Sequence, residues 1–402
     1  MMKTSEMTDR EATALDAPAA ALSSFVLVGA GETVVATGCR PVPVVAGVSL
    51  ARQAADALAD ARGGAAVLVG ALPYDHAQPA HLLRPAGWSR QPGRSAARAF
   101  GTPALVRADA YPRWQVTAEP SLAAYQAAVA EALARMERRP ELRKVVLARA
   151  LRVAGDRPID ARALLGRLAE DPAATAFCVP LPSQGGAGRL LVGATPELLV
   201  SRQGDAVLSH PLAGSARRSA DPSLDREAAE GLVASAKDQR EHREVVTAIL
   251  DQLAPHCREL GTPEGTQIVS TASMWHLGTR IVGRLHDTTL SSLDLAALLH
   301  PTPAVCGTPR DAAAAVIAEL EGHDRGFYAG AVGWCEANGD GAWYVALRCA
   351  EIAGNEARLH AGAGVVPGSD PVAEGEETAA KFAAMLRALG LDEAIAFDGA
   401  AR

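Results

Sequence analysis

Two isolated charged residues in apolar surroundings are the first candidates for acid–base chemistry. Lys144 begins the apolar run 144–149, where strand alternation would place it on the same face as Val146 and Ala148. Burial disfavours the charged form of an amine and lowers its pKa, which a general base needs at neutral pH. A lysine at a strand end can equally keep its ammonium group in solvent, so this segment leaves both interpretations open.

Glu197 is the matching candidate for a general acid. It follows the segment 193–196 (GATP) between two apolar runs, and the glycine and proline predict a turn that points its carboxyl group beside a sheet. A carboxyl group desolvated by apolar neighbours has a raised pKa and can stay protonated. A solvent-exposed turn glutamate is the alternative. A base and an acid from separate strands would suit an addition coupled to an elimination.

Two acidic pairs at helical spacing could bind a cation. Asp238 and Glu241 are three residues apart in one predicted helix, and Glu374 and Glu377 repeat the spacing in another. If the pairs face each other they repel unless a cation lies between them, and a few carboxylates suit Mg²⁺, which keeps waters and accepts substrate oxygens. Each pair alone could equally be a solvated helix face, since acidic neighbours such as Glu244 are common here.

Three further positions could bind an anion. Arg348 stands in the otherwise apolar run 345–350 of the predicted strand 342–352, where a charge is costly unless an anion pairs with it. Lys381 lies four residues after Glu377 and so on the same helix face. Gly362 belongs to a Gly-Ala-Gly segment whose amides could bind a carboxylate, although the full dinucleotide-binding pattern is missing.

The segment 299–309 (LHPTPAVCGTP) predicts a rigid loop, because three prolines and a glycine fit neither a helix nor a strand. It lies between two predicted helices, 291–299 and 310–320. Such a loop is either a stiff connector or one wall of a cleft between helices and sheet.

Composition excludes several classes of protein. The 402 residues carry a net charge of -7 with both signs interspersed, which makes nucleic acid an unexpected partner. The six cysteines are scattered without a C-x-x-C pair, so they indicate neither a zinc site nor a disulfide framework. No apolar run reaches the roughly 18 residues of a membrane span. We therefore expect a cytoplasmic protein without a membrane partner.

The pattern of strands and turns predicts an α+β fold, a single large layered domain with mixed, mostly antiparallel sheets and outer helices. Hairpins dominate, and β-α-β alternation is weak. Residues 1–20 are predicted as a flexible tail and 21–395 as the domain. The predicted strands are 24–29, 33–37, 65–72, 144–153, 175–181, 189–192, 197–202, 206–212, 267–270, 279–285, 327–336, 342–352 and 358–366; the other predicted helices are 50–62, 121–140, 224–253 and 372–389.

Eight ordered motifs resemble the signature of chorismate-utilising enzymes, most closely isochorismate synthases. They are 144–149, 193–197, 211–215, 237–242, 276–277, the proline loop 299–309, 327–330 and 374–381. The resemblance is dense from about residue 125 to 391 and looser in the N-terminal third. It implies the fold expected above.

The resemblance also implies a role for each motif residue. Lys144 would activate water for attack at ring C2 of chorismate, and Glu197 would protonate the departing C4 hydroxyl, giving isochorismate. Glu241 and Glu377, supported by Asp238 and Glu374, would hold Mg²⁺ at the ring carboxylate. The remaining pocket would be formed by Gly214 and Ser215 beside that carboxylate, by Arg348, Tyr328 and the Gly362 amide at the pyruvyl carboxylate, by Lys381 near the metal and by His276.

Single positions indicate the subfamily. Ala213 stands where aminodeoxychorismate synthases resemble one another in having a lysine, and Lys144 argues against ammonia-using anthranilate synthases, so no glutaminase subunit is expected. Ala304, where salicylate synthases tend to carry threonine, favours release of isochorismate. The continuation 305–309 resembles the siderophore type, which feeds 2,3-dihydroxybenzoate synthesis.

Other assignments remain open. A menaquinone-pathway isochorismate synthase and a salicylate synthase are the alternatives among enzymes, and a chorismate-binding regulatory subunit is the alternative outside them. Gly375 and His360 depart from the family pattern, which favours an aromatic residue and a tyrosine there. These departures concern the shape of the pocket. We expect a monomer.

Overall fold

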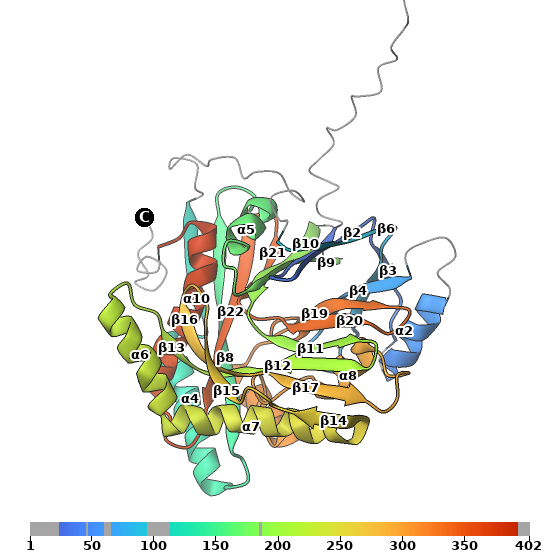
Figure 1. The fold of residues 1–402 in the computed structure, drawn as a ribbon. Coiled ribbons are helices and arrows are strands. Elements are labelled where there is room, and N and C mark those ends of the chain that lie inside the picture. The colour runs from blue at the N-terminus through green and yellow to red at the C-terminus, as the bar shows by residue number, and fades with distance from the viewer. Residues whose placement is uncertain (1–23, 46, 60–65, 95–112, 185–186, 393–402) are drawn as a thin grey trace, which may run out of the picture.

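The structure is a computed structural model that describes residues 24–45, 47–59, 66–94, 113–184 and 187–392. The predicted tail, 1–20, lies outside these residues. Two large sheets and one small sheet form the domain, with helices around them (Figure 1). Every strand pair between the described residues is antiparallel. The predicted α+β layered fold is confirmed.

The first large sheet carries the central strand β8. In spatial order its strands are β18 (Gly307–Thr308), β8 (Lys144–Gly155), β22 (Glu356–Val365), β21 (Cys349–Ala353), β10 (Ala187–Thr195), β9 (Thr175–Gln184), β1 (Phe25–Val28), β2 (Glu32–Thr37) and β6 (Gly87–Pro92), while β7 (Trp114–Glu119) also pairs with β8. The first eight residues of β8 are all buried, because neighbouring strands flank it and helices pack against it. A lysine at its start is therefore buried as well.

The second large sheet packs against the first. Its order is β14 (Cys257–Gly261), β17 (Ile281–Leu285), β12 (Ala206–His210), β11 (Leu198–Gln203), β20 (Gly341–Val345), β19 (Ala331–Glu336), β4 (Val67–Leu72), β5 (His81–Arg84) and β3 (Arg40–Val42). The core between the sheets includes Phe25 and Phe177 from the first and Trp334 and Trp343 from the second. Burial of these apolar surfaces is the main force that holds the layers together.

The small third sheet consists of β13 (Leu212–Arg217), β16 (Met274–Thr279) and β15 (Thr266–Ser270). Helix α7 (Ala236–Leu253) packs on β13 and β16, and α10 (Pro371–Leu389) packs on β22. The other helices are α2 (Leu50–Ala59), α4 (Leu122–Arg138), α5 (Ala161–Leu168), α6 (Pro222–Ala234), α8 (Ser292–Leu299) and α9 (Arg310–Glu321), with a 3-10 turn at Ala254–His256. The candidate residues come from β8, β13, β16, α7, β22 and α10 and from the loops that carry Glu197, Ala304, Tyr328 and Arg348.

Two predicted elements are divided in the structure. The predicted helix 224–253 is two helices, because Ser235 adopts an extended backbone and its hydroxyl accepts the Asp238 amide as the cap of α7. The predicted strand 342–352 is interrupted at Arg348, whose φ of 47° is left-handed. The segment 84–107, whose many prolines, glycines and arginines indicate a loop, contains β6 before residue 95, and its residues 95–107 lie outside the described part. Strands β3, β5, β7, β14 and β18 and most of β13 and β16 were not predicted.

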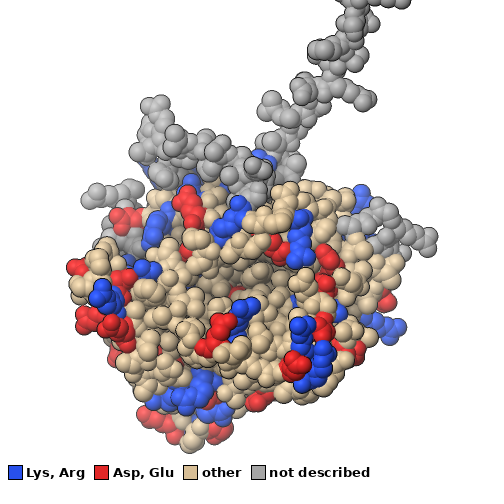
Figure 2. Space-filling view, in the orientation of Figure 1, with Lys and Arg blue, Asp and Glu red and all other residues tan. Residues whose placement is uncertain are grey.

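The surface carries charges of both signs without a large cluster of either on the face shown in Figure 2. This agrees with the mixed charge pattern of the sequence. No helix in the described ranges is long and apolar enough to cross a membrane.

Candidate active site

The proline loop is held against β8 as a short edge strand. Gly307 and Thr308 pair with Val145 and Lys144, and the Val146 amide donates to the Cys306 carbonyl at 2.7 Å. A Cβ on Gly307 would lie 2.1 Å from the Lys144 carbonyl oxygen, so only glycine allows this approach. The loop is therefore a wall fixed beside the start of β8 and not a free connector.

A pocket lies beside this wall and contains about 710 Å³ of space, including its opening to solvent. Of the residues predicted from the sequence, the pocket is lined by Glu197, Gly214, Ser215, Glu241, His276, Ala304, Tyr328, Arg348, Gly362 and Lys381. The other four, Lys144, Asp238, Glu374 and Glu377, lie around it without forming its lining. The structure thus brings the predicted positions together, while their chemical roles stay predictions.

Lys144 lies directly behind the pocket lining. Its side chain is fully buried, and its Nζ atom lies 3.0 Å from Oε1 of Glu241 on α7. Gly364 leaves room for this ion pair, because a Cβ there would lie 2.1 Å from the same Glu241 oxygen. Of the two interpretations left open by the sequence, the structure has the buried amine. For Lys144 to contact a ligand in the pocket, the Glu241 side chain must make room for the ligand beside it or move away.

Glu197 is a buried carboxyl group on the pocket wall. Only 2% of the residue is exposed, and its amide donates to Thr195 Oγ1 at 3.3 Å. Burial raises its pKa to about 8, against the opposing attraction of Lys144. The raised pKa expected from the sequence is therefore present, and the group is protonated at neutral pH. It has the protonation state that a general acid requires.

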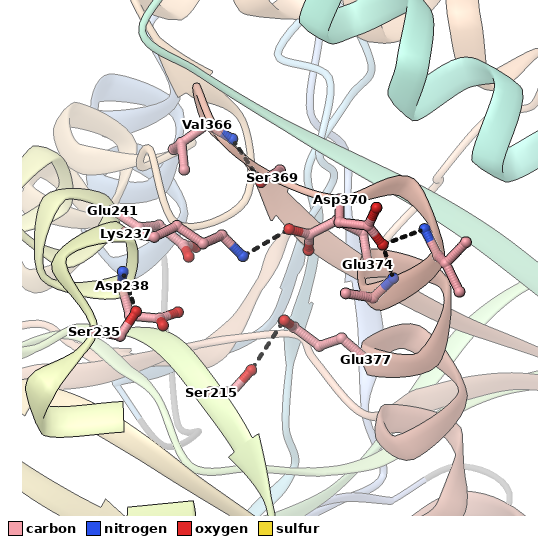
Figure 3. Close-up of polar contacts among 12 residues, drawn as sticks. Ser215, Ser235, Lys237, Asp238, Glu241, Val366, Ser369, Asp370, Glu374 and Glu377 are labelled. Carbon is pink, nitrogen blue, oxygen red and sulfur yellow. Dashed lines mark hydrogen bonds and ion pairs between the residues drawn. The ribbon is translucent and has the colours of Figure 1, made fainter. Parts of the chain in front are cut away.

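The four other carboxylates come from α7 and α10, and Figure 3 shows Lys237 of α7 reaching Glu374 of α10. Lys237 Nζ lies 2.6 Å from Glu374 Oε1, and Lys381 Nζ lies 2.6 Å from Glu377 Oε1. Ser215 also donates to Glu377, at 2.9 Å. Burial, and then repulsion from Glu377, raises the pKa of Glu374 to about 7. These are closely spaced acidic groups whose charge is only partly compensated.

The oxygen ligands that these four carboxylates offer are of the kind that Mg²⁺ prefers. The Oε2 atom of Glu374 is buried and has no hydrogen-bond partner. Burial raises the pKa of Asp238, and Glu241 and Glu377 raise it further. In the described part of the chain no three acidic, histidine or cysteine side chains converge on one point. Mg²⁺ is commonly bound by only one or two carboxylates together with waters and substrate oxygens, so this spacing is compatible with it.

Arg348 occupies a bend between β20 and β21 and not the strand predicted for it. The prediction was wrong because an arginine in an apolar run carries no local sign of a left-handed backbone. Its guanidinium group lines the pocket and donates to Thr271 Oγ1 at 3.0 Å and to His276 Nε2. Burial lowers its pKa to about 10, so it stays a cation at neutral pH. This end of the pocket can bind a carboxylate.

Tyr328 and Gly362 lie near Arg348, and Lys381 joins the two ends of the pocket. The ring of Tyr328 stacks on His360, with 4.8 Å between centroids. Lys381 donates to the Gly362 carbonyl at 2.9 Å as well as to Glu377. His360, which stands where the family pattern favours a tyrosine, is therefore accommodated by stacking on Tyr328.

The Gly375 departure is explained by a neighbouring helix. A Cβ on Gly375 would lie 2.9 Å from Leu122 Cδ1. Leu122 of α4 therefore occupies the space that an aromatic side chain at position 375 would need.

Sequence reasoning missed Arg325, which fixes two pocket walls. It pairs with Glu321 and donates to the carbonyls of Val305 at 2.7 Å and Val146 at 2.8 Å. Glu321 in turn accepts the Ala148 amide at 2.7 Å. The pair therefore ties the proline loop to β8. Its four-residue spacing at the end of α9 was visible in the sequence but resembles an ordinary surface ion pair.

Comparison with known proteins gives a consistent result. The chain is 45% identical over 346 residues to a Mycobacterium tuberculosis protein assigned as the isochorismate synthase MenF, covering 82% of this chain and 88% of the relative. It is 40% identical over 393 residues to the isochorismate synthase DhbC of Bacillus subtilis, covering 92% and 94%. Its fold matches the crystal structure of a Bacillus anthracis protein assigned as the 2,3-dihydroxybenzoate-specific isochorismate synthase DhbC, with a TM-score of 0.84, 37% identity and coverage of 92% and 97%.

The family described as "Chorismate binding enzyme" matches residues 99–390. This span contains all fourteen candidate residues predicted from the sequence. With the fold, the pocket and its polar residues now described, the resemblance is established, and the chain belongs to the chorismate-binding enzyme family.

Proposed function

We propose that this protein is an isochorismate synthase, which converts chorismate to isochorismate by adding water at ring C2 and eliminating the C4 hydroxyl. One observation carries the proposal: Glu197, a buried carboxyl group protonated at neutral pH, lines a pocket that also has cationic groups, and a buried amine, Lys144, lies directly behind that lining. A hydroxyl exchange needs one base and one acid, and a dianionic substrate needs cationic anchors.

The acid and base act on opposite parts of the exchange. Once its amine has given up the proton that it carries in the ion pair with Glu241, Lys144 takes a proton from the water that forms the new C2–O bond. The two ring double bonds shift as the C4–O bond breaks, and Glu197 gives its proton to the departing hydroxyl, which leaves as water. Lys144 ends protonated and Glu197 ionised, so their charges attract each other. Return of one proton from Lys144 to Glu197, directly or through solvent, restores the starting state.

Two ends of the pocket orient the substrate. Arg348, with Tyr328 beside it, binds the pyruvyl carboxylate, and the Gly362 amide completes that end. Gly214 and Ser215 lie at the ring carboxylate, next to Lys381 and the acidic groups. A Cβ on Gly214 would lie 3.0 Å from Asp238 Cβ, so glycine permits close packing of β13 and α7 there. His276 lines the wall between the two ends.

Mg²⁺ is proposed as the cofactor, held by Glu241 and Glu377 with Asp238 and Glu374 in support. When bound, it would neutralise the carboxylates and attract the ring carboxylate of the substrate. The residues that would hold it are at present compensated by lysines, so Lys237 and Lys381 must share these acidic partners with the ion. The unpartnered Oε2 atom of Glu374 supports this arrangement.

A role in 2,3-dihydroxybenzoate synthesis for a catecholate siderophore is proposed from the 305–309 motif and from the DhbC names of two relatives. The Mycobacterium tuberculosis relative is assigned as MenF, so a menaquinone-pathway role is the alternative. Ala304 supports release of isochorismate over continuation to salicylate. The presence of both Lys144 and Glu197 supports an enzyme over a regulatory subunit.

The proposal is tested by incubating the purified chain with chorismate and Mg²⁺ without ammonia, followed by chromatography of the products. We expect isochorismate. Lys144→Ala and Glu197→Gln should each lower turnover by roughly 10² or more, because each removes a proton-transfer group, while both variants keep the fold. Unchanged chorismate, or near-normal turnover in either variant, would contradict the proposed activity or the assigned roles.

A further inference from the structure

Arg348 is held by two neutral groups. Its guanidinium donates to the Thr271 hydroxyl at 3.0 Å and to the His276 ring. Among the described residues no carboxylate forms an ion pair with it; Asp171 and Glu197 attract it only over longer distances. Hydrogen-bond acceptors without charge can orient a guanidinium group while leaving its charge available for an anion. The pocket thus fixes the direction of this cation without neutralising it.

The Thr271 hydroxyl can interact with Arg348 only as a hydrogen-bond acceptor. A hydroxyl has one proton and two lone pairs. Thr271 Oγ1 donates to the Met274 carbonyl at 3.3 Å and accepts the Met274 amide at 3.1 Å. The remaining lone pair accepts from Arg348, so every hydrogen-bonding position of the hydroxyl is in use. Thr271 is 2% exposed and is not part of the pocket lining, so it acts through Arg348 and does not contact a ligand.

The turn that carries Thr271 is fastened on several sides. Arg218 donates to the carbonyls of Thr271 and Ser273, at 3.3 and 3.0 Å, and the Ala272 amide donates to Asp171 at 2.9 Å. This turn joins β15 to β16, whose sheet also carries Ser215 at the other end of the pocket. A rigid turn at this place fixes Arg348 relative to the residues around Glu377.

Arg348 itself is in an unfavourable backbone conformation. Non-glycine residues rarely adopt a φ of 47°, and such strain persists only where the surroundings hold it. A long side chain on a strained bend has several possible directions unless partners select one. The two acceptors from the small sheet supply that selection.

We propose that Thr271 is a positioning residue that orients Arg348 to receive a carboxylate of the substrate, an inference that rests on the proposed function. Thr271→Val keeps the side-chain volume and the Thr271 amide's own bond to the Met274 carbonyl, 2.8 Å long, but removes the hydroxyl. It should raise the KM for chorismate about tenfold and change kcat less than about twofold, because ground-state and transition-state binding are weakened alike. Thr271→Ser keeps the hydroxyl and should restore most of the affinity.

Matched variants separate positioning from a loss of stability. Thr33 is another buried threonine, on β2 outside the pocket, whose hydroxyl donates to the Gly93 carbonyl, so Thr33→Val should lower Tm without changing KM. In an Arg348→Met background, Thr271→Val should change kcat/KM by less than about twofold, since the residue it acts through is gone. A full tenfold effect in that background, or a Thr271→Val variant with the wild-type KM, would refute the role of Thr271.

Calorimetric titration with chorismate separates this inference from the proposed function. If the wild-type chain binds chorismate without converting it, the proposed reaction fails, and the Kd of Thr271→Val relative to wild type still decides the positioning role. If the wild-type chain neither binds nor converts chorismate, both proposals are overturned.

Discussion

Lys144 and Glu241 form an ion pair of 3.0 Å that links the first strand position of β8 to the middle of α7. The lysine is fully buried and the glutamate side chain 10% exposed, so neither charge can be solvated if the other is removed. Breaking a buried pair costs more than the pair contributes, because one charge is left without a partner. The pair also connects Lys144, the proposed base, to Glu241, a proposed Mg²⁺ ligand. A change in the geometry of this pair should therefore affect both roles.

Gly364→Ala tests this geometry. The new Cβ would lie 2.1 Å from Glu241 Oε1 and 3.1 Å from Lys144 Cε, and β22 cannot withdraw because Gly364 pairs with Val146 of β8. Glu241 must therefore leave its position. We expect at least about a tenfold loss of turnover and a loss of about 2 kcal/mol in the free energy of unfolding.

The control for this variant is Gly231→Ala on α6, where no atom lies within 4 Å of the new Cβ. It should keep full turnover and have an equal or higher Tm, because alanine favours the helix. Steady-state kinetics and thermal unfolding of both variants decide the matter. A Gly364→Ala enzyme with normal turnover would mean that the position of Glu241 is unimportant.

The protonation of Glu197 predicts how activity depends on pH. A group that must donate a proton loses its function as pH rises through its pKa, here about 8. We expect kcat/KM to fall above pH 8, approaching tenfold per pH unit. The measurement is a pH–rate profile between pH 6 and 10. A flat profile above pH 8 would remove Glu197 from the role of acid.

The same group predicts how stability depends on pH. The folded protein keeps the Glu197 proton up to about pH 8, whereas the ordinary pKa is 4.5, so between these values the folded state binds more protons than the unfolded state. The contribution of Glu197 to the free energy of unfolding therefore decreases as pH rises through this window. Glu197→Gln should weaken the decrease, which thermal unfolding at several pH values would detect.

The sequence predicted the elements with strong periodicity and missed features that depend on distant residues. The helix α4 begins after Ser121 as expected, because its cap and apolar face are local signals. The break at Ser235 was missed because a serine is also compatible with a helix surface. The segment around Glu197 left both a buried and an exposed carboxyl group open, and the contacts of the folded chain decide for burial. The Glu321–Arg325 pair likewise acquires its role only through contacts with Val146 and Val305, which no local pattern contains.

Mg²⁺ dependence is predicted from the four carboxylates of α7 and α10. Excess chelator should abolish turnover, and Glu377→Gln should lower it strongly, because closely spaced negative charges repel each other and the substrate. Added Mg²⁺ should also raise the Tm of the ligand-free protein, since an ion that binds the folded state stabilises it. Glu244→Gln is the control: Glu244 lies on α7, as the proposed ligand Glu241 does, but pairs with Arg143 on the exposed side. Full activity in chelator would exclude the metal from the reaction.

Ala304 predicts which product is released. It lines the pocket in the proline loop, and its amide donates to Thr302 Oγ1 at 3.3 Å, so the loop presents a methyl group to the ligand. Loss of pyruvate from isochorismate requires the ring and side chain to align for a second step, which a small apolar residue does little to enforce. Wild-type protein should release isochorismate with little salicylate at neutral pH, and Ala304→Thr should shift part of the product to salicylate and pyruvate. A coupled pyruvate assay with chromatography measures both. Stoichiometric pyruvate from the wild-type chain would make the protein a salicylate synthase and leave only its family membership unchanged.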